Sequence, residues 1–328
     1  GWTARAIIHA LSQRIGCFFR GGSFSRSHSV MVSLSPRGVL RGPYSKYMTR
    51  IDLHTHSAYS DGTDTPAELM EKARQAHLDV VGLTDHDTYA GWDEAAACVE
   101  RTGVSLVRGV ELSCAREGIT VHLLGYLPDP ANEALLAVQR RATESRLTRA
   151  QKIVERLAED YPITWEQVRA LAPEGGPVGR PHIADALVEI GAFPDRSAVF
   201  AQTLHPSSRY YVMHWAPDPV DAVELVRAAG GVPVLAHPRA RARQRLLPEG
   251  VIDMMKDAGL FGIERDHRDH TEEDRADVER IARRLKLEVF GSSDYHGLGK
   301  PNQLGENLTD QSVRNKLEEE AFLEVLHP

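Results

Sequence analysis

A short stretch near residue 50 combines side chains that bind divalent metal ions. Residues 51–56 alternate apolar and polar with the period of a β-strand, so His54 and His56 are expected to point to the same side of it. Asp61 follows within a short turn. Two imidazoles and a carboxylate so close together are typical metal ligands. Isolated histidines are more often structural, so this interpretation requires further ligands elsewhere in the chain.

Further potential ligands stand at the ends of other predicted strands. With the first three they give nine nitrogen or oxygen donors, too many for one ion with four to six ligands. The number suits two or three ions that share a carboxylate. Without metals, burying so many polar groups would cost kilocalories for each unpaired group. The absence of thiolates favours manganese, zinc or iron. The further donors are His86, Glu111, His122, His237, Asp294 and His296.

A cluster of this kind predicts hydrolysis of a phosphate ester. A hydroxide held between the metals can attack an electrophilic centre while the ions neutralise the charge on the surrounding oxygens. Phosphate esters are the natural substrates, because their negative charge must be neutralised before a nucleophile approaches. The chain has no GxSxG, no P-loop and no GxGxxG after a predicted strand. Serine-hydrolase, NTPase and dinucleotide-binding functions therefore lack support.

Strands that alternate with helices are expected to position these ligands. This order is typical of an α/β fold with a mostly parallel sheet or barrel, whose sites gather at the carboxyl ends of the strands. Thr65, Pro66 and Glu68 mark the start of the first helix. Strands are predicted at 51–55, 80–83, 105–111, 119–127, 232–236, 262–264 and 287–290, and helices at 66–77, 91–101, 218–229, 248–258, 272–285 and 311–325.

The alternation breaks in the middle of the chain. Residues 131–160 have one long helical pattern, and two or three shorter helices are expected up to about residue 214. We therefore predict a barrel formed by 48–127 and 217–328, with 128–216 as a helical insertion that caps the site. Within it, Arg180 and His182 stand in a turn that opens a helix and could contact an anion. A surface arginine and a helix-capping histidine fit the same spacing equally well.

Residues 1–47 differ from the rest in composition. Residues 1–50 contain eight Arg and Lys and no Asp or Glu, a net charge of +8. Because the whole chain has a net charge of −7, residues 51–328 carry −15. This N-terminal segment resembles a transit peptide, or it is non-native or upstream-translated sequence, which we favour; in either case poor order is expected. The acidic body argues against a broad surface for duplex DNA.

Apolar runs and cysteines bear on the location of the protein. No apolar run approaches the ~20 residues that span a bilayer, so no transmembrane helix and no membrane partner are predicted. Cys17, Cys98 and Cys114 form neither an even set nor a CxxC spacing. Disulfides and a thiolate zinc site are therefore not expected, and a reducing, cytoplasmic location fits.

Six motifs together resemble one known family. In chain order they are HTHSAYSDGTDTP, GLTDHDT, GVELS, HLLGY, AHP and GSSDYHG, and they span nearly all of residues 50–300. The set is similar to the polymerase-and-histidinol-phosphatase (PHP) superfamily. With the segments GRPH and GIE and the insertion, the chain most resembles the stand-alone phosphoesterases. These include nucleoside 3′,5′-bisphosphate phosphatases and enzymes that trim short RNA from its 5′ end (RNase AM type).

The resemblance implies a fold, a cofactor and a ligand set. The fold is a distorted seven-stranded (β/α) barrel with a trinuclear metal site, often manganese, for which zinc and iron are alternatives. By motif, the first ion would be held by His54, His56, Glu111 and Asp294, the second by Asp61, His86 and His296, and the third by Glu111, His122 and His237, with Glu111 as the bridge.

The resemblance also implies roles in catalysis and substrate binding. Arg180 and His182 would face the substrate phosphates from the cap, and His267 after GIE is a further candidate. Glu111, Asp294 and His182 are the expected catalytic residues. The general acid is left open between His182 and a metal-bound water. Three other histidines are expected to be surface or packing residues, namely His205, His214 and His270.

Three functions are compatible with these residues. The first is removal of the 3′-phosphate from a nucleoside 3′,5′-bisphosphate, giving the 5′-monophosphate. The second keeps the chemistry but acts on the 5′ end of short RNA, or on a small phosphate ester of the histidinol-phosphate type. The third, a metal-binding interaction domain without turnover, is opposed by the complete ligand set. Release of phosphate with added manganese distinguishes the third from the others.

Overall fold

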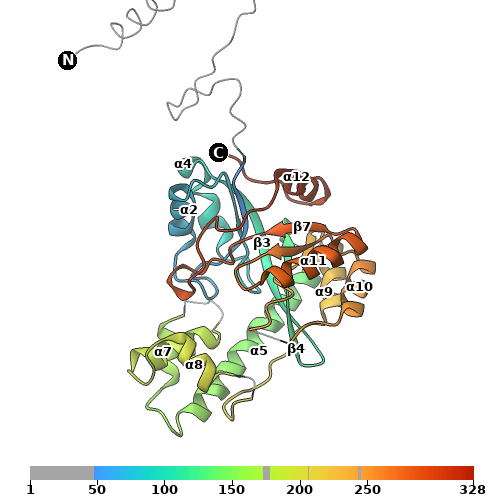
Figure 1. The fold of residues 1–328 in the computed structure, drawn as a ribbon. Helices are drawn as coiled ribbons and strands as arrows, with labels where there is room; N and C mark the ends of the chain where they lie inside the picture. Colours follow the sequence, from blue (N-terminus) through green and yellow to red (C-terminus); the bar gives the residue numbers. More distant parts are fainter. Residues whose placement is uncertain (1–47, 173–177, 206, 243–244) are drawn as a thin grey trace, which may run out of the picture. The chain divides into compact units, whose positions relative to one another are not determined.

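Seven β-strands in chain order form a sheet that curls into a nearly closed barrel (Figure 1). The computed structural model describes residues 48–172, 178–205, 207–242 and 245–328. The edges of the sheet approach each other, because Thr55 bridges to Tyr295 and the Thr309 amide donates to the Ile51 carbonyl. The predicted seven-stranded α/β barrel is confirmed. The strands are β1 (Ile51–Thr55), β2 (Val80–Leu83), β3 (Ser105–Arg116), β4 (Ile119–Tyr126), β5 (Val232–Leu235), β6 (Gly262–Asp266) and β7 (Glu288–Gly291).

One strand runs against the others. β4 is antiparallel to β3 and β5, whereas the remaining neighbours are parallel. The predicted end of β3 at Glu111 is wrong, since the strand continues to Arg116 and turns directly into β4. His122 likewise lies within a strand, opposite Ser113, while Glu111 pairs with Leu124. Because side chains alternate between faces, His122 and Glu111 are diagonal neighbours on one face.

Local sequence signals account for most of the helices. The Thr65 side chain accepts from the Glu68 amide, and Pro66 opens α2, whose buried face includes Leu69 and Ala73. The single helix predicted at 91–101 is two short ones, and the last helix ends at Glu320 rather than near 325. The helices are α2 (Pro66–Gln75), α3 (Trp92–Ala96), α4 (Val99–Thr102), α5 (Glu133–Leu157), α6 (Trp165–Ala170), α7 (Arg180–Glu189), α8 (Arg196–Gln202), α9 (Pro219–Ala228), α10 (Glu249–Asp257), α11 (Glu272–Leu285), the short η1 (Gly297–Gly299) and α12 (Gln311–Glu320).

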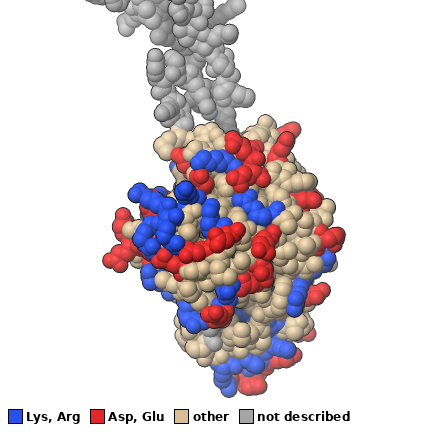
Figure 2. Space-filling view, turned by 90° about the vertical axis from the view of Figure 1, so that its right-hand side faces the viewer, with Lys and Arg blue, Asp and Glu red and all other residues tan. Residues whose placement is uncertain are grey.

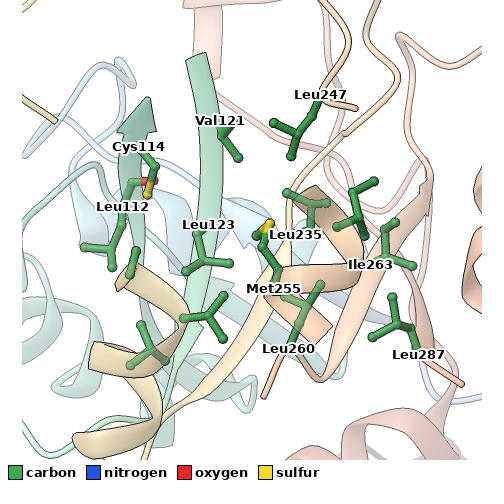
Figure 3. Packing of buried hydrophobic residues seen from close by; sticks show 14 of the residues in the cluster. Leu112, Cys114, Val121, Leu123, Leu235, Leu247, Met255, Leu260, Ile263 and Leu287 are labelled. Carbon is green, nitrogen blue, oxygen red and sulfur yellow. The ribbon is translucent and has the colours of Figure 1, made fainter. Parts of the chain in front are cut away.

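The main apolar cluster fixes the second half of the sheet against α9, α10 and α11 (Figure 3). Leu123 of β4, Leu235 of β5 and Ile263 of β6 contribute from the sheet side, and Met255 of α10 packs against them. Each such side chain, fully buried, contributes about 1.5–3 kcal/mol. This packing holds the strands whose ends carry the candidate ligands.

The helices α5 to α8 have an apolar cluster of their own, and we refer to them as the helical segment. Ile153 of α5, Ile183 of α7 and Val199 of α8 meet in it. α5 extends from beside the sheet to α7 and α8 (Figure 1). Residues Thr49–Pro328 form one compact unit, so a separate cap domain at 128–216 stays a prediction. The predictions for residues 1–47 fall outside the described residues.

The remaining expectations concern membranes and cysteines. In the described ranges, every helix is too short or too polar to cross a bilayer. Cys98 and Cys114 are buried free thiols, and Cys17 lies outside the described part of the chain.

Candidate metal centre

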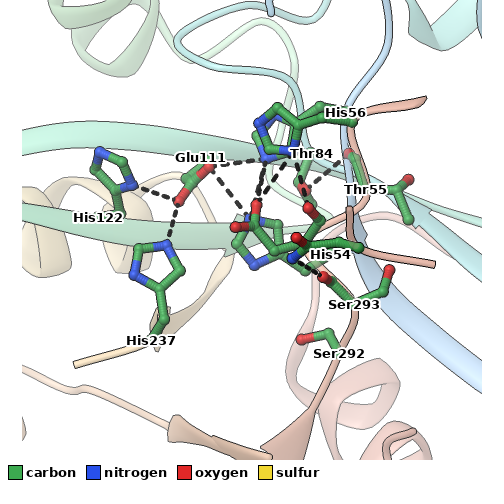
Figure 4. Close-up of polar contacts among 12 residues, drawn as sticks. His54, Thr55, His56, Thr84, Glu111, His122, His237, Ser292 and Ser293 are labelled. Carbon is green, nitrogen blue, oxygen red and sulfur yellow. Dashed lines mark hydrogen bonds and ion pairs between the residues drawn. The ribbon is translucent and has the colours of Figure 1, made fainter. Parts of the chain in front are cut away.

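Glu111 lies at the centre of a group of histidines (Figure 4). Its Oε2 is 3.2 Å from His54 Nε2 and 3.0 Å from His56 Nε2. Its Oε1 is 2.8 Å from His122 Nδ1 and 3.3 Å from His237 Nε2. The two oxygens of one buried carboxylate therefore face two separate pairs of imidazoles. That is the arrangement of a carboxylate that bridges two ions.

Asp61 organises a second group beside the first. Its carboxylate oxygens are 3.1 Å from His296 Nε2, 3.7 Å from His56 Nδ1 and 3.7 Å from His86 Nε2. The other ring nitrogen of His86 is 3.4 Å from Glu111 Oε2. His86, in the loop after β2, thus stands between the two carboxylates.

Asp294, directly after β7, completes the centre. Its Oδ1 is 3.4 Å from the Nε2 atoms of both His54 and His56. Its Oδ2 lies 3.0 Å from the Lys300 ammonium and 3.4 Å from His267 Nε2. One oxygen therefore faces His54 of β1 and His56 just after it, and the other is held by groups outside the ligand set.

Three groups of these side chains could each hold an ion, because their ligand atoms lie within 4.8 Å of one another. The first has the composition expected for the first ion, and the second adds His56 to the expected set. The third contains His86 where His237 was expected. The groups are His54, His56, Glu111 and Asp294; His56, Asp61, His86 and His296; and His86, Glu111 and His122.

The centre contains buried polar atoms without hydrogen bonds, which is a direct test of whether a metal fits. Among the described residues, both Glu111 oxygens lack a hydrogen-bond partner, because their short contacts to the imidazoles are not aligned as hydrogen bonds. Each such buried atom costs about 1–3 kcal/mol unless something else satisfies it. Divalent cations fit this donor set. The unpaired ring nitrogens are His86 Nδ1, His122 Nδ1, His237 Nδ1 and His296 Nε2.

Burial and mutual charge set the protonation states of the centre. Burial alone would raise the pKa of Glu111, but the charges of His122, His86 and His54 hold it well below its usual range. Burial lowers the pKa of His237 to about 3 and that of His296 to about 4. Ionised carboxylates and neutral imidazoles are the forms that bind metals.

His54, in β1, and His56, just after it, differ from these histidines. Burial lowers the pKa of His56, but the carboxylates Asp294, Glu111 and Asp61 raise it to about 9. The pKa of His54 is raised well above its ordinary value in the same way, because the charges of Glu264, Glu111 and Asp294 outweigh the effect of burial.

Glu264, in β6, is a supporting residue that the sequence did not identify. His54 Nδ1 donates to its Oε1 at 2.8 Å, which directs Nε2 of the same ring into the centre. Oε2 accepts from the His237 amide at 2.8 Å, and the Ser292 hydroxyl donates to Oε1. Burial raises the pKa of Glu264, but the charges of His54, His267 and His237 outweigh it and leave the pKa at about 2. An acid inside a buried strand was the available signal.

Three of the seven described non-glycine residues with positive φ lie at this centre. Asp87, His237 and Asp294 have φ values of 52°, 26° and 53°, in the left-handed region that residues other than glycine rarely adopt. Such conformations cost of order 1–3 kcal/mol and persist where surrounding contacts fix them. Two of the three are candidate ligands, and the third follows the ligand His86.

The predicted substrate residues on α7 lie at its first turn. Arg180 Nη1 donates to the Leu204 carbonyl at 3.1 Å. His182 is buried, and its Nδ1 accepts from the Gly179 amide at 3.1 Å. Burial lowers the pKa of His182, against a smaller opposing effect of Asp61. The ring is therefore neutral, with its proton on Nε2.

His267, the further candidate for substrate contact, lies beside Asp294. Its side chain is fully buried. Nδ1 accepts from the Asp269 amide at 3.1 Å, so Nε2 carries the proton that points to Asp294 Oδ2. These contacts favour a role in orienting Asp294, and contact with substrate stays a prediction. His270 is a packing residue, as expected, because it is buried and bonded to the backbone of Arg265 and Arg239.

Comparisons with known proteins identify the family of this chain. A family model described as PHP domain matches residues 52–164. The chain is 35% identical over 254 residues to a 3′,5′-nucleoside bisphosphate phosphatase of Chromobacterium violaceum, covering 77% of this chain and 89% of that protein. It is 33% identical over 262 residues to a 5′-3′ exoribonuclease of Haemophilus influenzae, covering 79% and 94%.

A third relative and a solved structure extend the comparison. The chain is 36% identical over 254 residues to a phosphoribosyl 1,2-cyclic phosphate 1,2-diphosphodiesterase of Eggerthella lenta, covering 75% of this chain and 94% of that protein. A structure from Bifidobacterium adolescentis, assigned as a metal-dependent phosphoesterase, superposes with a TM-score of 0.79 at 42% identity and covers 83% of this chain and 96% of that one. The chain belongs to the PHP-domain family of metal-dependent phosphoesterases.

Proposed function

We propose that this phosphoesterase removes the 3′-phosphate from nucleoside 3′,5′-bisphosphates, giving the nucleoside 5′-monophosphate and phosphate. The observation that carries the proposal is the bridging position of Glu111 between two sets of histidines. The substrate class rests on the bisphosphate phosphatase of C. violaceum, which matches over 89% of its length.

Side chains from several strands would hold the ions, which we propose to be three, with manganese favoured over zinc or iron. Bound divalent ions supply a nucleophile at neutral pH and neutralise the charge on phosphate oxygens. Glu111 holds the groups together, Asp294 fixes the histidines of β1 against β7, and Glu264 sets the ring of His54. The proposed ligands are His54, His56, Asp61, His86, Glu111, His122, His237, Asp294 and His296.

The first turn of α7 would act on the substrate side. His182 carries its proton on Nε2, because Nδ1 accepts from Gly179, and it can donate that proton to the departing ribose oxygen. Arg180 would contact a substrate phosphate with the donors left free by its bond to Leu204. We further propose that residues 128–216 act as the cap over the centre.

The similarity to a 5′-3′ exoribonuclease supports an alternative substrate for this chain, the 5′ end of short RNA. On the face shown in Figure 2, Lys and Arg gather in one group at the left beside Asp and Glu, and elsewhere on that face the two charges are mixed. Binding a long polyanion requires a broad basic surface. The net charge of −15 over residues 51–328 supports a small nucleotide over an extended nucleic acid.

Phosphate release by metal-stripped protein reloaded with manganese tests the proposal. The substrates are adenosine 3′,5′-bisphosphate, histidinol phosphate and a short 5′-phosphorylated RNA. We expect AMP from the bisphosphate at the highest kcat/KM, and no turnover by Glu111→Gln. Faster release of nucleotides from the RNA would replace the proposal with the exoribonuclease activity. A lack of turnover on all three would reject the substrate class.

A further inference from the structure

His56 belongs to both the first and the second candidate ligand group, and each group faces a different nitrogen of its ring. Nε2 is 3.0 Å from Glu111 Oε2 (Figure 4) and 3.4 Å from Asp294 Oδ1, which belong to the first group. Nδ1 is 3.7 Å from Asp61 Oδ1, which belongs to the second. A neutral imidazole binds a metal through the nitrogen that carries no proton. The position of the ring proton therefore decides which of the two ions His56 binds.

The hydroxyl of Ser60 is placed to fix that proton. Its Oγ is 3.4 Å from His56 Nδ1 and 2.6 Å from Asp85 Oδ1. A serine hydroxyl has one proton and two lone pairs, whereas an ionised carboxylate only accepts. The proton of Ser60 lies on the short bond to Asp85, because the contact of the same hydroxyl with Asp61 Oδ1 is 3.5 Å long. Toward His56 the hydroxyl therefore presents a lone pair, which accepts a hydrogen bond from a protonated Nδ1.

Asp85, in the loop after β2, keeps the hydroxyl in this orientation. Its side chain is buried, and its carboxylate accepts three hydrogen bonds from one loop. Oδ1 accepts from the Ser57 amide at 2.8 Å as well as from Ser60, and Oδ2 accepts from the Ser57 hydroxyl at 2.6 Å. The Ser60 amide donates to the Ser57 carbonyl at 3.1 Å, which closes the loop around the carboxylate. Ser60 could turn its proton toward His56 only by breaking a short bond to a buried carboxylate, and such bonds are among the strong ones.

This relay is a variant of a common support for metal-binding histidines. Such rings usually donate their second N–H to a carboxylate, a backbone carbonyl or a water, which fixes both the ring proton and the orientation of the ring. His54 makes this contact directly, with Glu264. For His56 the acceptor is the Ser60 hydroxyl, with Asp85 behind it. The two neighbouring rings thus have separate supports.

We propose that Ser60 and Asp85 are positioning residues, which keep the ring proton of His56 on Nδ1 so that Nε2 binds an ion in the first group and none in the second. The second group then binds its ion through three side chains, those of Asp61, His86 and His296. Three protein ligands leave a position for water or substrate, as in catalytic zinc sites, whereas four would close the site. The proposal rests on the metal centre of the proposed function and is independent of the substrate.

Ser60→Ala tests this role, because it removes the hydroxyl and leaves every candidate ligand in place. Asp85→Asn is a second variant, whose neutral amide accepts a weaker hydrogen bond from Ser60. Ser105→Ala is the matched control. The Ser105 hydroxyl, at the first residue of β3, also contacts a histidine ring, at 3.0 Å from Nδ1 of His327, but that histidine lies outside the ligand groups of the described residues.

The first readout is the position of the ring proton in protein loaded with zinc, which is diamagnetic. Long-range proton–nitrogen spectra of isotope-labelled histidine distinguish a protonated ring nitrogen from one bound to a metal, and His56→Gln identifies the signals of His56 by their loss. We expect a proton on Nδ1 of His56 in the natural protein and in Ser105→Ala. In Ser60→Ala this signal should disappear through exchange with water or be replaced by a proton on Nε2, and in Asp85→Asn it should exchange faster than in the natural protein.

The second readout is calorimetric titration of metal-stripped protein with manganese. In Ser60→Ala we expect the affinity of one site to fall about 10–100-fold, as for other outer partners of metal ligands, and that of the remaining sites to stay within about threefold. An equal loss at every site would indicate a general loosening of the structure and would overturn the positioning role. Thermal melting shows whether each variant is folded, and the spectrum of the natural protein tests the proposal even if a variant is not.

The outcomes separate this inference from the proposed function. A proton on Nε2 of His56 in the natural zinc-loaded protein would overturn the positioning role and leave the phosphatase activity in place. So would a Ser60→Ala variant that keeps both the Nδ1 proton and the natural affinities. If the natural protein hydrolyses none of the three phosphate esters but Ser60→Ala still loses the Nδ1 proton, the positioning role stands and the proposed substrate class fails.

Discussion

At the scale of single residues, one carboxylate decides what the site can do. Glu111 is almost fully buried, and its two oxygens contact different imidazoles. In the absence of cations both oxygens lack hydrogen bonds within the described structure. A carboxylate in that position is satisfied by two cations at once. This geometry is the reason why we propose a cluster of ions in place of a single one.

Glu264 should control how tightly that cluster is bound. The Glu264 carboxylate accepts hydrogen bonds from His54, His237 and Ser292. In Glu264→Gln the NH2 group of the new amide would face at least one of these donors, so at least one hydrogen bond is lost. We expect manganese affinity to fall about 10–100-fold, as for other outer partners of metal ligands. Calorimetric titration of the metal-free protein measures this, with the exposed Glu273→Gln as the control. Unchanged affinity would show that the ring of His54 is held by other contacts.

His214 should contribute to the dependence of stability on pH. Its pKa is about 3 in the folded protein, through burial and the charges of Arg149, Arg146, Arg180 and His122, against an ordinary value of 6.5. Between these values the unfolded chain binds a proton that the folded protein does not. Stability from this group is therefore complete above pH 6.5 and declines as the pH falls, by up to about 1.4 kcal/mol per pH unit.

Urea unfolding at pH 7 and pH 5 measures that contribution. The natural protein should lose more stability between the two values than His214→Gln, whereas His205→Gln, a change at an exposed histidine, should follow the natural protein. Identical pH dependence in all three proteins would mean that His214 takes up a proton without cost.

At the scale of elements, the close contact of β1 and β2 depends on a glycine. A Cβ on Gly82 would lie 2.2 Å from the carbonyl oxygen of Leu53, the residue before His54. Gly82→Ala must therefore push β2 away from β1, which carries the candidate ligand His54 and leads into His56. We expect a loss of several kcal/mol in the free energy of unfolding, beyond the 1–3 kcal/mol that overpacking usually costs.

The matched control for that change is Gly250→Ala in the first turn of α10, where nothing lies within 4 Å of the added Cβ. It should stabilise the protein by up to about 1 kcal/mol, because alanine is the better helix former. Denaturant unfolding compares the two. If Gly82→Ala were as stable as the natural protein, the two strands would have to be separable without affecting the fold.

Element prediction succeeded where local chemistry decides and failed where pairing does. Thr65, Pro66 and Glu68 define the start of α2 by contacts within four residues, and the helix begins as predicted. The hairpin of β3 and β4 has a local signal in Glu117 and Gly118, whose positive φ values form its two-residue turn, but the prediction did not use it. Its antiparallel register brings His122 close to Glu111. The prediction included His122 because ligands were expected at the ends of strands, whereas His122 lies within β4.

At the scale of the whole molecule, the sequence indicated the candidate ligands but not the residues that support them. His54, His56, Asp61, His86 and His296 stand in compact motifs whose spacing survives any folding detail. Glu264 and Asp85 are acids within or just after ordinary strand patterns. Their roles arise only when distant segments meet, as in the contact of His54 with Glu264 or of Ser60 with Asp85. Single-sequence patterns carry no information about such meetings.

The centre also joins the barrel across its width. Its candidate ligands come from β1, β3 and β4 and from the loops after β1, β2, β5 and β7. Cations bound there would link strands that are far apart in the sequence, and they would remove the cost of the unpaired atoms around Glu111. A ligand that binds only the folded state stabilises it by mass action.

Manganese should therefore raise the melting temperature of metal-stripped protein. At a free concentration of 100 times Kd, each site should add about 2.7 kcal/mol to the free energy of unfolding. Because Glu111 faces two ligand groups while Asp61 faces one, Glu111→Gln should lose more of this stabilisation than Asp61→Asn. Differential scanning calorimetry with and without manganese measures both, and the surface variant Arg140→Met gives the reference. Equal losses in the two ligand variants would contradict the bridging role of Glu111, and no stabilisation of the natural protein would contradict the metal centre itself.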